Sequence, residues 1–274
     1  MERKAINLHL ISDSTGETLS SVSRAVLSQF ENVDTNEFIW SLVRTKSQID
    51  KVKEEIAANP GIVMYTILED KLAEDIKLYC SEKQLPCIPV LSRIISEFSN
   101  YLNMNIAHSI GRQHLLDADY FAKVEAINYT INHDDGQSNW DLYNADIIII
   151  GVSRTSKSPT SVYLSCRGYK TANVPFVSMA TIPESLFSLK KPLIVGLVIN
   201  PEKLLQIRET RLQHMGQDLP MLYTNIDAIK FEINEARKLY AKLGCPIIDV
   251  TKRSVEETAA KIIQLLYEHK QVNK

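Results

Sequence analysis

The sequence predicts an α/β protein with parallel sheets flanked by helices and a phosphate-loop-like nucleotide-binding unit in its C-terminal half. Short apolar runs alternate along the chain with longer amphipathic segments, the order expected of a parallel sheet covered by helices. A run of four isoleucines, Ile147–Ile150, ends at Gly151 and leads through a polar turn into an amphipathic segment. Strand, turn and helix in this order are typical of a phosphate-binding loop.

The N-terminal part of the chain alternates between strands and helices. Short apolar runs predict strands at Ile6–Ile11, Phe38–Val43, Ile62–Ile67 and Cys87–Val90. Apolar residues at helical spacing predict helices at Thr18–Phe30, Ile49–Ala58, Lys71–Glu82 and Ser92–Leu102. Residues 103–116 lack periodicity and are expected to connect two regions, so we divide the chain into domains 1–110 and 111–274.

The C-terminal part continues the same alternation. A helix is expected at Asp119–Ile131, followed by the strand from about Ala145 and the helix after its turn. Further strands are predicted at Pro175–Val177, Leu193–Ile199 and Pro246–Val250, and further helices at Pro201–His214 and Asp227–Leu243. Ser254 is expected to cap the last helix, because Glu257 three residues later completes a capping box.

Composition limits the classes of function. The net charge of −2 gives no overall field that would attract nucleic acid or an anionic membrane. No apolar run approaches the roughly 20 residues that span a bilayer, and the N-terminus lacks the apolar core of a signal peptide. We therefore expect a cytoplasmic protein. The scattered cysteines fit reduced thiols rather than a zinc site; they are Cys80, Cys87, Cys166 and Cys245.

The turn after Gly151 carries the strongest functional signal. The standard phosphate-loop pattern is G-x-x-x-x-G-K-[ST], and this chain matches it except that Ser156 replaces the second glycine. In such a loop, backbone N–H groups and the helix dipole bind phosphate. Lys157 would reach the terminal phosphate, the Ser158 hydroxyl would bind Mg²⁺, and Arg154 would clamp phosphate oxygens. The alternative is a strand–turn–helix with an incidental Lys-Ser pair.

Three other clusters have both a functional and a structural interpretation. Residues 12–18, SDSTGET, follow the first strand, where α/β proteins build binding sites, but Ser14 or Thr15 could simply cap the next helix. Residues 133–136, HDDG, could hold Mg²⁺ or supply a general base, or form a solvated turn. Arg208 and Arg211 share one helix face and could meet phosphate or an acidic partner, although such pairs are more often solvated.

Taken together, these clusters resemble the bacterial and plastid regulatory proteins of pyruvate, phosphate dikinase, a family with relatives that act on phosphoenolpyruvate synthase. The resemblance covers essentially the whole chain, and its most specific part is GVSRTSKSPTS. The segments that carry it are HLISDSTGET (9–18), YFAKVEAINYTINHDDGQ (120–137), ADIIIIGVSRTSKSPTSVYLS (145–165), VGLVINPEKLLQIRETRL (195–212) and DVTKRSVEETA (249–259).

The resemblance implies a bifunctional enzyme. Family members use ADP to phosphorylate a threonine of the dikinase, which inactivates it, and remove that phosphate by phosphorolysis, with inorganic phosphate attacking and pyrophosphate leaving. Carried over, the ADP-binding residues are Gly151, Val152, Ser153, Arg154, Thr155, Ser156, Lys157 and Ser158. Lys157, Arg154 and Asp135 become the expected catalytic residues, with Asp135 as the base for the threonine hydroxyl. Mg²⁺ is the expected metal, with Ser158 as a ligand.

The target is inferred from the departure at Ser156. Synthase-directed relatives tend to read R-C-G-K-T, and dikinase-directed ones R-T-S-K-T, which residues 154–157 match. The dikinase is therefore the preferred protein partner, with phosphoenolpyruvate synthase as the alternative. A phosphate-loop kinase of small metabolites and a non-catalytic ADP sensor also stay open, as does a homodimer. No strand ends in an evident magnesium-binding aspartate, which weakens a generic NTPase assignment.

Overall fold

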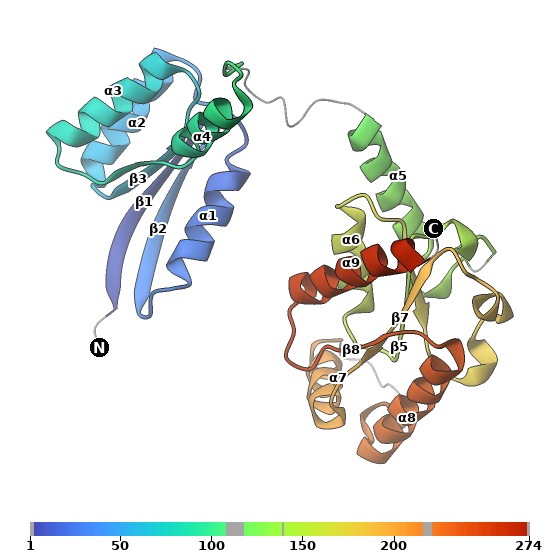
Figure 1. The fold of residues 1–274 in the computed structure, drawn as a ribbon. Coiled ribbons are helices and arrows are strands. Elements are labelled where there is room, and N and C mark those ends of the chain that lie inside the picture. The colour runs from blue at the N-terminus through green and yellow to red at the C-terminus, as the bar shows by residue number, and fades with distance from the viewer. Residues whose placement is uncertain (1–2, 108–117, 139, 216–220, 273–274) are drawn as a thin grey trace. The chain divides into compact units, whose positions relative to one another are not determined.

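The computed structural model describes residues 3–107, 118–138, 140–215 and 221–272 (Figure 1). The chain forms two compact units, Met1–Leu115 and Leu116–Lys274. Each unit contains a four-stranded sheet with all strand pairs parallel, and helices flank both sheets. The predicted α/β class is therefore confirmed. The predicted boundary between residues 110 and 111 lies outside the described residues.

The first unit is a short parallel sheet between helical layers. Its strand order, β2-β1-β3-β4, places β1 where the chain changes from one side of the sheet to the other. Leu19 of α1 packs on one face of the sheet, while α2 and α3 cover the other. The elements are β1 (Lys4–Ser12), α1 (Glu17–Leu27), β2 (Val33–Trp40), α2 (Lys46–Ala58), β3 (Ile62–Thr66), α3 (Asp70–Glu82), β4 (Cys87–Pro89) and α4 (Ser92–Leu102).

Strand β2 begins five residues before the predicted strand Phe38–Val43. It pairs with β1 along its whole length, from Lys4 opposite Val33 to Ile11 opposite Trp40. Because β2 is an edge strand with alternating exposure, it accommodates polar residues that break the apolar run. The prediction followed the apolar residues and missed the polar half of the strand.

The second unit has strand order β6-β5-β7-β8, so that β5 lies at its switch point. The four isoleucines Ile147–Ile150 form most of β5 and are fully buried, as expected of a central parallel strand. Helix α6 packs against α5 and α9, and α7 packs against α8. The main elements are α5 (Ala118–Asn132), β5 (Ile147–Gly151), α6 (Lys157–Ser165), β6 (Thr171–Pro175), β7 (Leu193–Val198), α7 (Pro201–Met215), α8 (Ile226–Leu243), β8 (Ile247–Asp249) and α9 (Val255–Val272).

Strand β6 shares only Pro175 with the predicted strand Pro175–Val177, which is therefore wrong in position. The strand pairs with β5 from Thr171 to Pro175, and its first four residues are buried. Thr171 and Asn173 interrupt its apolar pattern, which hid the strand from periodicity. Both polar side chains are nevertheless buried, and Asn173 belongs to the site described below.

The last helix and the molecular surface agree with the sequence. The predicted capping box is confirmed: Ser254 Oγ accepts from Glu257 N at 3.1 Å, and Ser254 N donates to Glu257 Oε2 at 2.9 Å.

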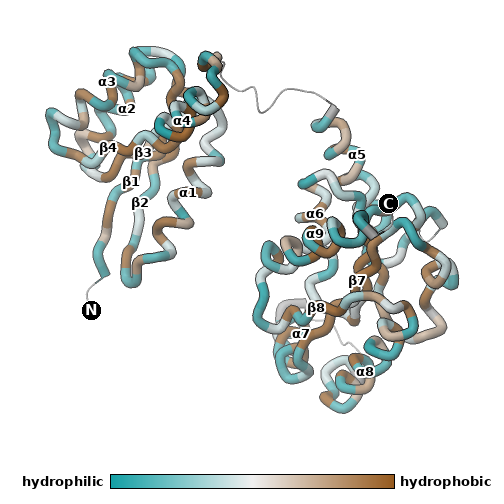
Figure 2. Tube along the Cα trace, in the orientation of Figure 1, coloured by the Kyte–Doolittle hydropathy of each residue, from teal (hydrophilic) through white to brown (hydrophobic). Residues whose placement is uncertain are grey.

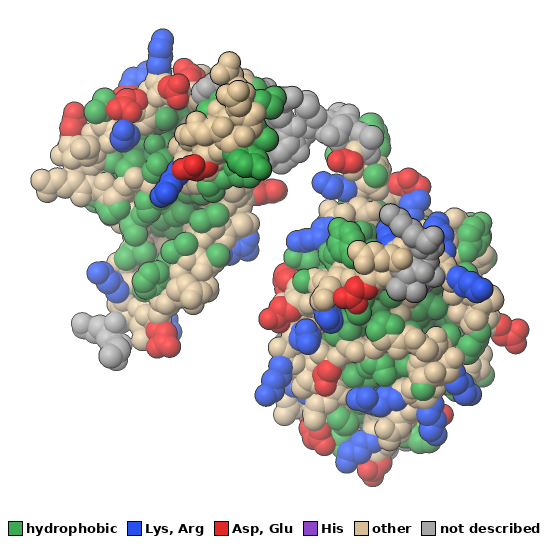
Figure 3. Space-filling model, in the orientation of Figure 1, with side chains coloured by type: hydrophobic (Ala, Val, Ile, Leu, Met, Phe, Trp, Pro, Cys, Tyr) green, Lys and Arg blue, Asp and Glu red, His purple; other side chains and the backbone are tan. Residues whose placement is uncertain are grey.

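Figure 2 shows hydrophobic residues along strands such as β7. Charges of both signs intersperse on the face of the second unit shown in Figure 3. In the described ranges, no helix combines the length and apolarity needed to cross a bilayer.

Candidate functional site

The predicted phosphate loop connects β5 to α6 in the second unit. Strand β5 ends at Gly151, five residues form the turn, and α6 begins at Lys157. The loop thus follows the carboxyl end of the central strand at the switch point of the sheet, where α/β proteins place their ligands. The N-terminus of α6 also brings unpaired backbone N–H groups to this end of the sheet, which favours an anion.

The loop backbone is left-handed at two residues with side chains. Arg154 has φ of 71° and Ser156, the N-cap residue of α6, has φ of 59°. Glycine adopts such values without the steric penalty of a Cβ atom, which explains why the standard pattern has glycine at the position of Ser156. Ser156 thus takes a left-handed conformation that glycine adopts more readily.

We expect substitutions at Ser156 to follow this backbone conformation. Ser156→Gly should change the free energy of unfolding by less than about 1 kcal/mol, because relief of strain and greater unfolded-chain entropy oppose each other. Ser156→Val should destabilise the unit by about 1–2 kcal/mol, because a β-branched residue resists positive φ. Denaturant unfolding measures both, with Ser153→Val in the same loop as the control. Equal stability of the valine and glycine variants would contradict the left-handed assignment.

Lys157 is a buried cation in the loop. Its side chain is about 5% exposed, and its Nζ donates to the Val152 carbonyl at 3.1 Å. Burial lowers the pKa of Lys157 from 10.5 to about 8, although Asp135 and Asp134 oppose this shift; Arg154 and Arg208 add to it. A phosphate placed beside the ammonium group would favour its charged form. Gly151 allows the close packing, since a Cβ there would lie 2.6 Å from Thr155 Oγ1.

The HDDG segment lies next to this loop, in the short 3₁₀ helix η2 (Asp134–Gly136). Asp134 Oδ1 accepts from Ser158 Oγ at 2.9 Å and from Asn173 Nδ2 at 2.5 Å. Asp135, at φ of 49°, is exposed, and its Oδ1 lies 3.3 Å from Asn173 Nδ2. The segment is a turn, as the structural alternative predicted. This turn nevertheless places both carboxylates beside the predicted phosphate loop.

His133 anchors this turn. Its ring stacks on Tyr129 with centroids 3.8 Å apart, and its Nδ1 lies 2.7 Å from the Tyr129 carbonyl. Its Nε2 contacts the buried Asp141 carboxylate. His133 O also accepts from Asn173 N at 2.9 Å, which ties the turn to β6.

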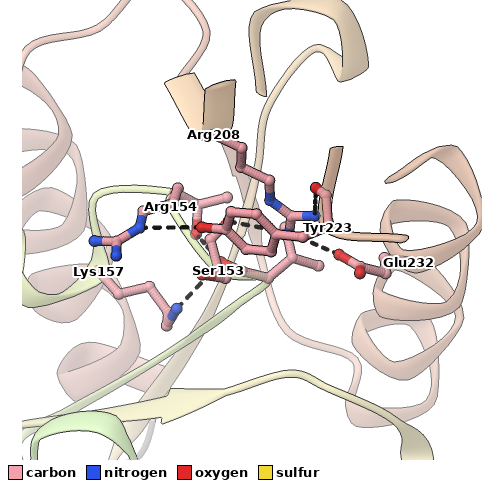
Figure 4. Close-up of polar contacts among 8 residues, drawn as sticks. Ser153, Arg154, Lys157, Arg208, Tyr223 and Glu232 are labelled. Carbon is pink, nitrogen blue, oxygen red and sulfur yellow. Dashed lines mark hydrogen bonds and ion pairs between the residues drawn. The ribbon is translucent and has the colours of Figure 1, made fainter. Parts of the chain in front are cut away.

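The two arginines of α7 have different environments. Arg208 is 1% exposed and forms an ion pair with Glu232 of α8 (Figure 4), whereas Arg211 is exposed. The expectation of a solvated pair is therefore wrong for Arg208 and confirmed for Arg211. Tyr223, from the 3₁₀ helix η6 (Met221–Thr224), lies between Arg208 and the loop, and its hydroxyl accepts from Arg154 Nε at 3.3 Å.

Residues 12–18, SDSTGET, follow β1 in the first unit as the β5–α6 loop follows β5 in the second. The expected cap by Ser14 or Thr15 is wrong: Gly16, at φ of 86°, is the N-cap residue of α1, with no side-chain cap hydrogen bond. Backbone contacts hold those two residues in the loop instead. Ser14 O accepts from Leu42 N, and Thr15 O accepts from Ser41 Oγ, both at 2.9 Å.

Asp13 in this loop should make stability depend on pH. Burial raises the pKa of its carboxyl above 3.8, against the Leu68 N–H and Arg44, so the folded state keeps this proton to higher pH than the unfolded state. Wild-type stability should therefore fall relative to Asp13→Asn as pH rises from about 4 to about 7. Unfolding curves across this range test it, with the exposed Asp34→Asn as control. A wild-type gain over this range would contradict it.

The structure adds residues that sequence analysis did not assign to the site. Asn173, Tyr223 and Glu232 come from three different elements, whereas Asp134 and Arg208 had been considered only as members of their sequence clusters. The contacts of these residues join positions 15 to 55 residues apart in the chain, so no local sequence pattern predicts the contacts. The polar Asn173 within a short apolar segment is the one local signal that could have been used.

Comparisons with known proteins identify a family and several similar chains. A family model described as kinase/pyrophosphorylase matches residues 8–263. Proteins provisionally named pyruvate, phosphate dikinase regulatory protein are 47% identical in Maricaulis maris, over 96% of this chain and 94% of that protein. A Caulobacter vibrioides relative of the same name is 47% identical over 95% and 82%, and an Ehrlichia chaffeensis relative is 47% identical over 94% and 95%.

Among solved structures, the complex of VinN with L-aspartate is 13% identical, covering 85% of this chain and 62% of that one. Its TM-score is 0.23, which is too low to carry any conclusion.

Proposed function

Because the chain belongs to the kinase/pyrophosphorylase family, we propose that it regulates pyruvate, phosphate dikinase by transferring a phosphoryl group from ADP to a threonine, and by removing it again through phosphorolysis. One observation carries this proposal most strongly. Lys157 is buried at the start of α6, in the loop that follows the central strand, and the carboxylates of Asp134 and Asp135 lie near it. The names of the relatives supply the partner.

Each residue of the site has a role in this chemistry. In the forward reaction, the threonine oxygen attacks the β-phosphorus of ADP, the bond to the bridging oxygen breaks, and AMP leaves. Asp135 accepts the hydroxyl proton, which its exposed carboxylate is free to do. Lys157, Arg154 and the loop N–H groups stabilise charge on the transferred group. In the reverse direction, inorganic phosphate attacks the phosphothreonine, and pyrophosphate leaves as the threonine regains its proton.

The residues present fit a magnesium ion held jointly with the nucleotide. Ser158 Oγ and Asp134 Oδ1 are 2.9 Å apart, and the buried Asn173 Oδ1 has no hydrogen-bond partner. These are the oxygen donors that Mg²⁺ takes. The residues with defined placement contain no group of three or more His, Cys, Asp or Glu side chains that could hold a metal. Phosphate oxygens and water would therefore complete the shell, and the bound ion would neutralise phosphate charge.

The test is transfer of label from ADP carrying a labelled β-phosphate to purified pyruvate, phosphate dikinase in its phosphohistidine form. We expect label on a dikinase threonine, none from ATP labelled at its γ-phosphate, and release of labelled pyrophosphate when inorganic phosphate is added. Transfer to phosphoenolpyruvate synthase alone would reassign the target. Transfer to neither enzyme would contradict the proposal. The functions left to test would then be a kinase of small metabolites and a non-catalytic ADP sensor.

A further inference from the structure

Arg208 is buried deeply for a residue of its charge, and all its contacts lie around the phosphate loop. Its Nη2 donates to Glu232 Oε2 at 2.7 Å and to the Ser153 carbonyl at 3.3 Å. Its Nη1 donates to the Tyr223 carbonyl at 3.1 Å, and its guanidinium carbon lies 4.6 Å from the Tyr223 ring centroid. Glu232 supplies the opposite charge that a buried guanidinium requires.

The Ser153 contact connects Arg208 to the strained part of the loop. The Ser153 carbonyl belongs to the same peptide group as the nitrogen of Arg154, which has φ of 71°. A hydrogen bond that fixes the orientation of this peptide plane restricts rotation into the ordinary φ range. Left-handed conformations of residues with a Cβ persist when their surroundings hold them in this way. Arg208 is placed to provide part of that restraint.

Tyr223 connects Arg208 to the side chain of Arg154. Arg208 contacts the carbonyl and the ring of Tyr223, and the Tyr223 hydroxyl accepts from Arg154 Nε (Figure 4). In the chain as described, the two terminal amino groups of Arg154 make no hydrogen bond, and they point away from Tyr223 in Figure 4. One edge of the guanidinium is therefore fixed, and the fork that binds phosphate oxygens remains available.

We propose that Arg208 and Tyr223 are positioning residues for phosphate binding: Arg208 holds the loop and Tyr223, and Tyr223 orients Arg154 toward the phosphates of a nucleoside diphosphate. The inference rests on the proposed function for the identity of the ligand. Neither Arg208 nor Tyr223 bonds to the ligand in this proposal. Their effect must therefore pass through Arg154 and the loop, and this dependence separates them from residues that bind the ligand directly.

A double-mutant cycle on the full chain tests this dependence, with ADP and inorganic pyrophosphate as calorimetric probes. Tyr223→Phe should weaken binding of ADP about five- to tenfold, near the upper end of what one typical hydrogen bond contributes. Arg154→Ala should weaken it about ten- to a hundredfold. In the Arg154→Ala background, Tyr223→Phe should have no further effect, because the side chain that it orients is gone. Equal effects of Tyr223→Phe in both backgrounds would overturn the proposal.

Tyr163→Phe is the matched control. Tyr163 of α6 also pairs with an arginine: its hydroxyl accepts from Arg167 Nη2 at 2.5 Å, and the guanidinium carbon lies 3.7 Å from its ring centroid. Both residues lie outside the site, so this variant should bind ADP as the wild type does. A loss of affinity in Tyr163→Phe equal to that in Tyr223→Phe would show a general effect of losing an arginine–tyrosine hydrogen bond, and would overturn the proposal.

Arg208→Lys adds a second arm. Lysine keeps the charge opposite Glu232 but cannot bond Ser153 and Tyr223 together in a planar fork. It should lower affinity for ADP at least as much as Tyr223→Phe, and Tyr223→Phe should add little to it. If Arg208→Lys does not fold, the cycle between Tyr223 and Arg154 decides alone. Wild-type affinity in a folded Arg208→Lys protein would overturn the role of Arg208.

These measurements separate the two proposals. Binding with the expected coupling, but no transfer to either target enzyme, would leave the positioning roles standing and contradict the proposed reaction. Transfer without coupling between Tyr223 and Arg154 would do the reverse. A wild-type protein that binds neither ADP nor pyrophosphate would overturn both.

Discussion

Lys157→Met should lower the rate of phosphoryl transfer from ADP about 10²- to 10³-fold, the loss expected when a charge-stabilising donor is removed from a buried site. Lys157 is the one cation of the loop that is both buried and bonded to it, through the Val152 carbonyl. Methionine fills a similar volume without the charge that neutralises the transferred group. The rate should be measured with saturating ADP and dikinase, so that the loss reflects the chemical step.

The same substitution should not destabilise the fold. Burial holds the pKa of Lys157 near 8, so the protonated ammonium is destabilised in the folded state at neutral pH. Removing it should raise the free energy of unfolding by about 1–2 kcal/mol, after allowance for the lost hydrogen bond. Val152 O keeps a donor, since Thr155 Oγ1 lies 2.9 Å away. An inactive but more stable protein would identify a residue kept for function.

Lys170→Met is the matched control for Lys157→Met. Lys170 lies just before β6 in the same unit and forms an ion pair with Glu125 at 2.6 Å, away from the loop. Its loss should leave the transfer rate unchanged. A Lys157→Met protein that keeps the wild-type rate within tenfold would contradict the assignment of Lys157.

Asp135→Asn should lower the rate of threonine phosphorylation about 10²- to 10⁴-fold, because an amide cannot accept the hydroxyl proton. The side chain is exposed at a turn with positive φ, and only the 3.3 Å contact with Asn173 Nδ2 restrains its carboxylate in the described residues. The Asp135 carboxylate thus lies beside the loop and keeps oxygen atoms that can accept a proton. Quantitative transfer assays over a range of Mg²⁺ concentrations measure the effect.

Asp134→Asn separates the role of base from that of metal ligand. Asp134 accepts from both Ser158 and Asn173, which suits a residue that holds Mg²⁺ with Ser158. Its loss of rate should be partly relieved by raising the Mg²⁺ concentration, whereas the loss in Asp135→Asn should not. Full activity of Asp135→Asn would disprove its role as base, and a loss relieved by Mg²⁺ would make it a metal ligand instead.

The sequence predicted the strand, turn and helix around Lys157 because their signal is local. A buried strand, a Lys-Ser pair and a following helix lie within about twenty residues, and each is constrained by its own pattern. The departure at Ser156 could be seen in the sequence, but not its consequence. Only the observed φ of 59° shows that Ser156 is left-handed, a conformation that glycine adopts without steric penalty.

The rest of the site depends on contacts between distant segments. Asn173 reaches Asp134 across 39 positions, and Arg208 reaches Ser153 across 55. Glu232, 24 residues later, supplies the charge that pairs with the buried Arg208, and the local sequence of α7 does not predict this partner. The polar edge strand β2 was misplaced for a related reason. Pairing with β1 fixes its extent, whereas its own apolar residues mark only its end.

The central claim is that the β5–α6 loop binds the phosphates of ADP, and amide hydrogen exchange of the full chain with and without ADP tests it most directly. Phosphate bound by the loop should slow exchange most at residues 152–158, where backbone N–H groups would donate to it. Lys157→Met should reduce this protection. The strongest protection at residues 12–18 of the first unit, with none at residues 152–158, would contradict the account and place the nucleotide in the other unit.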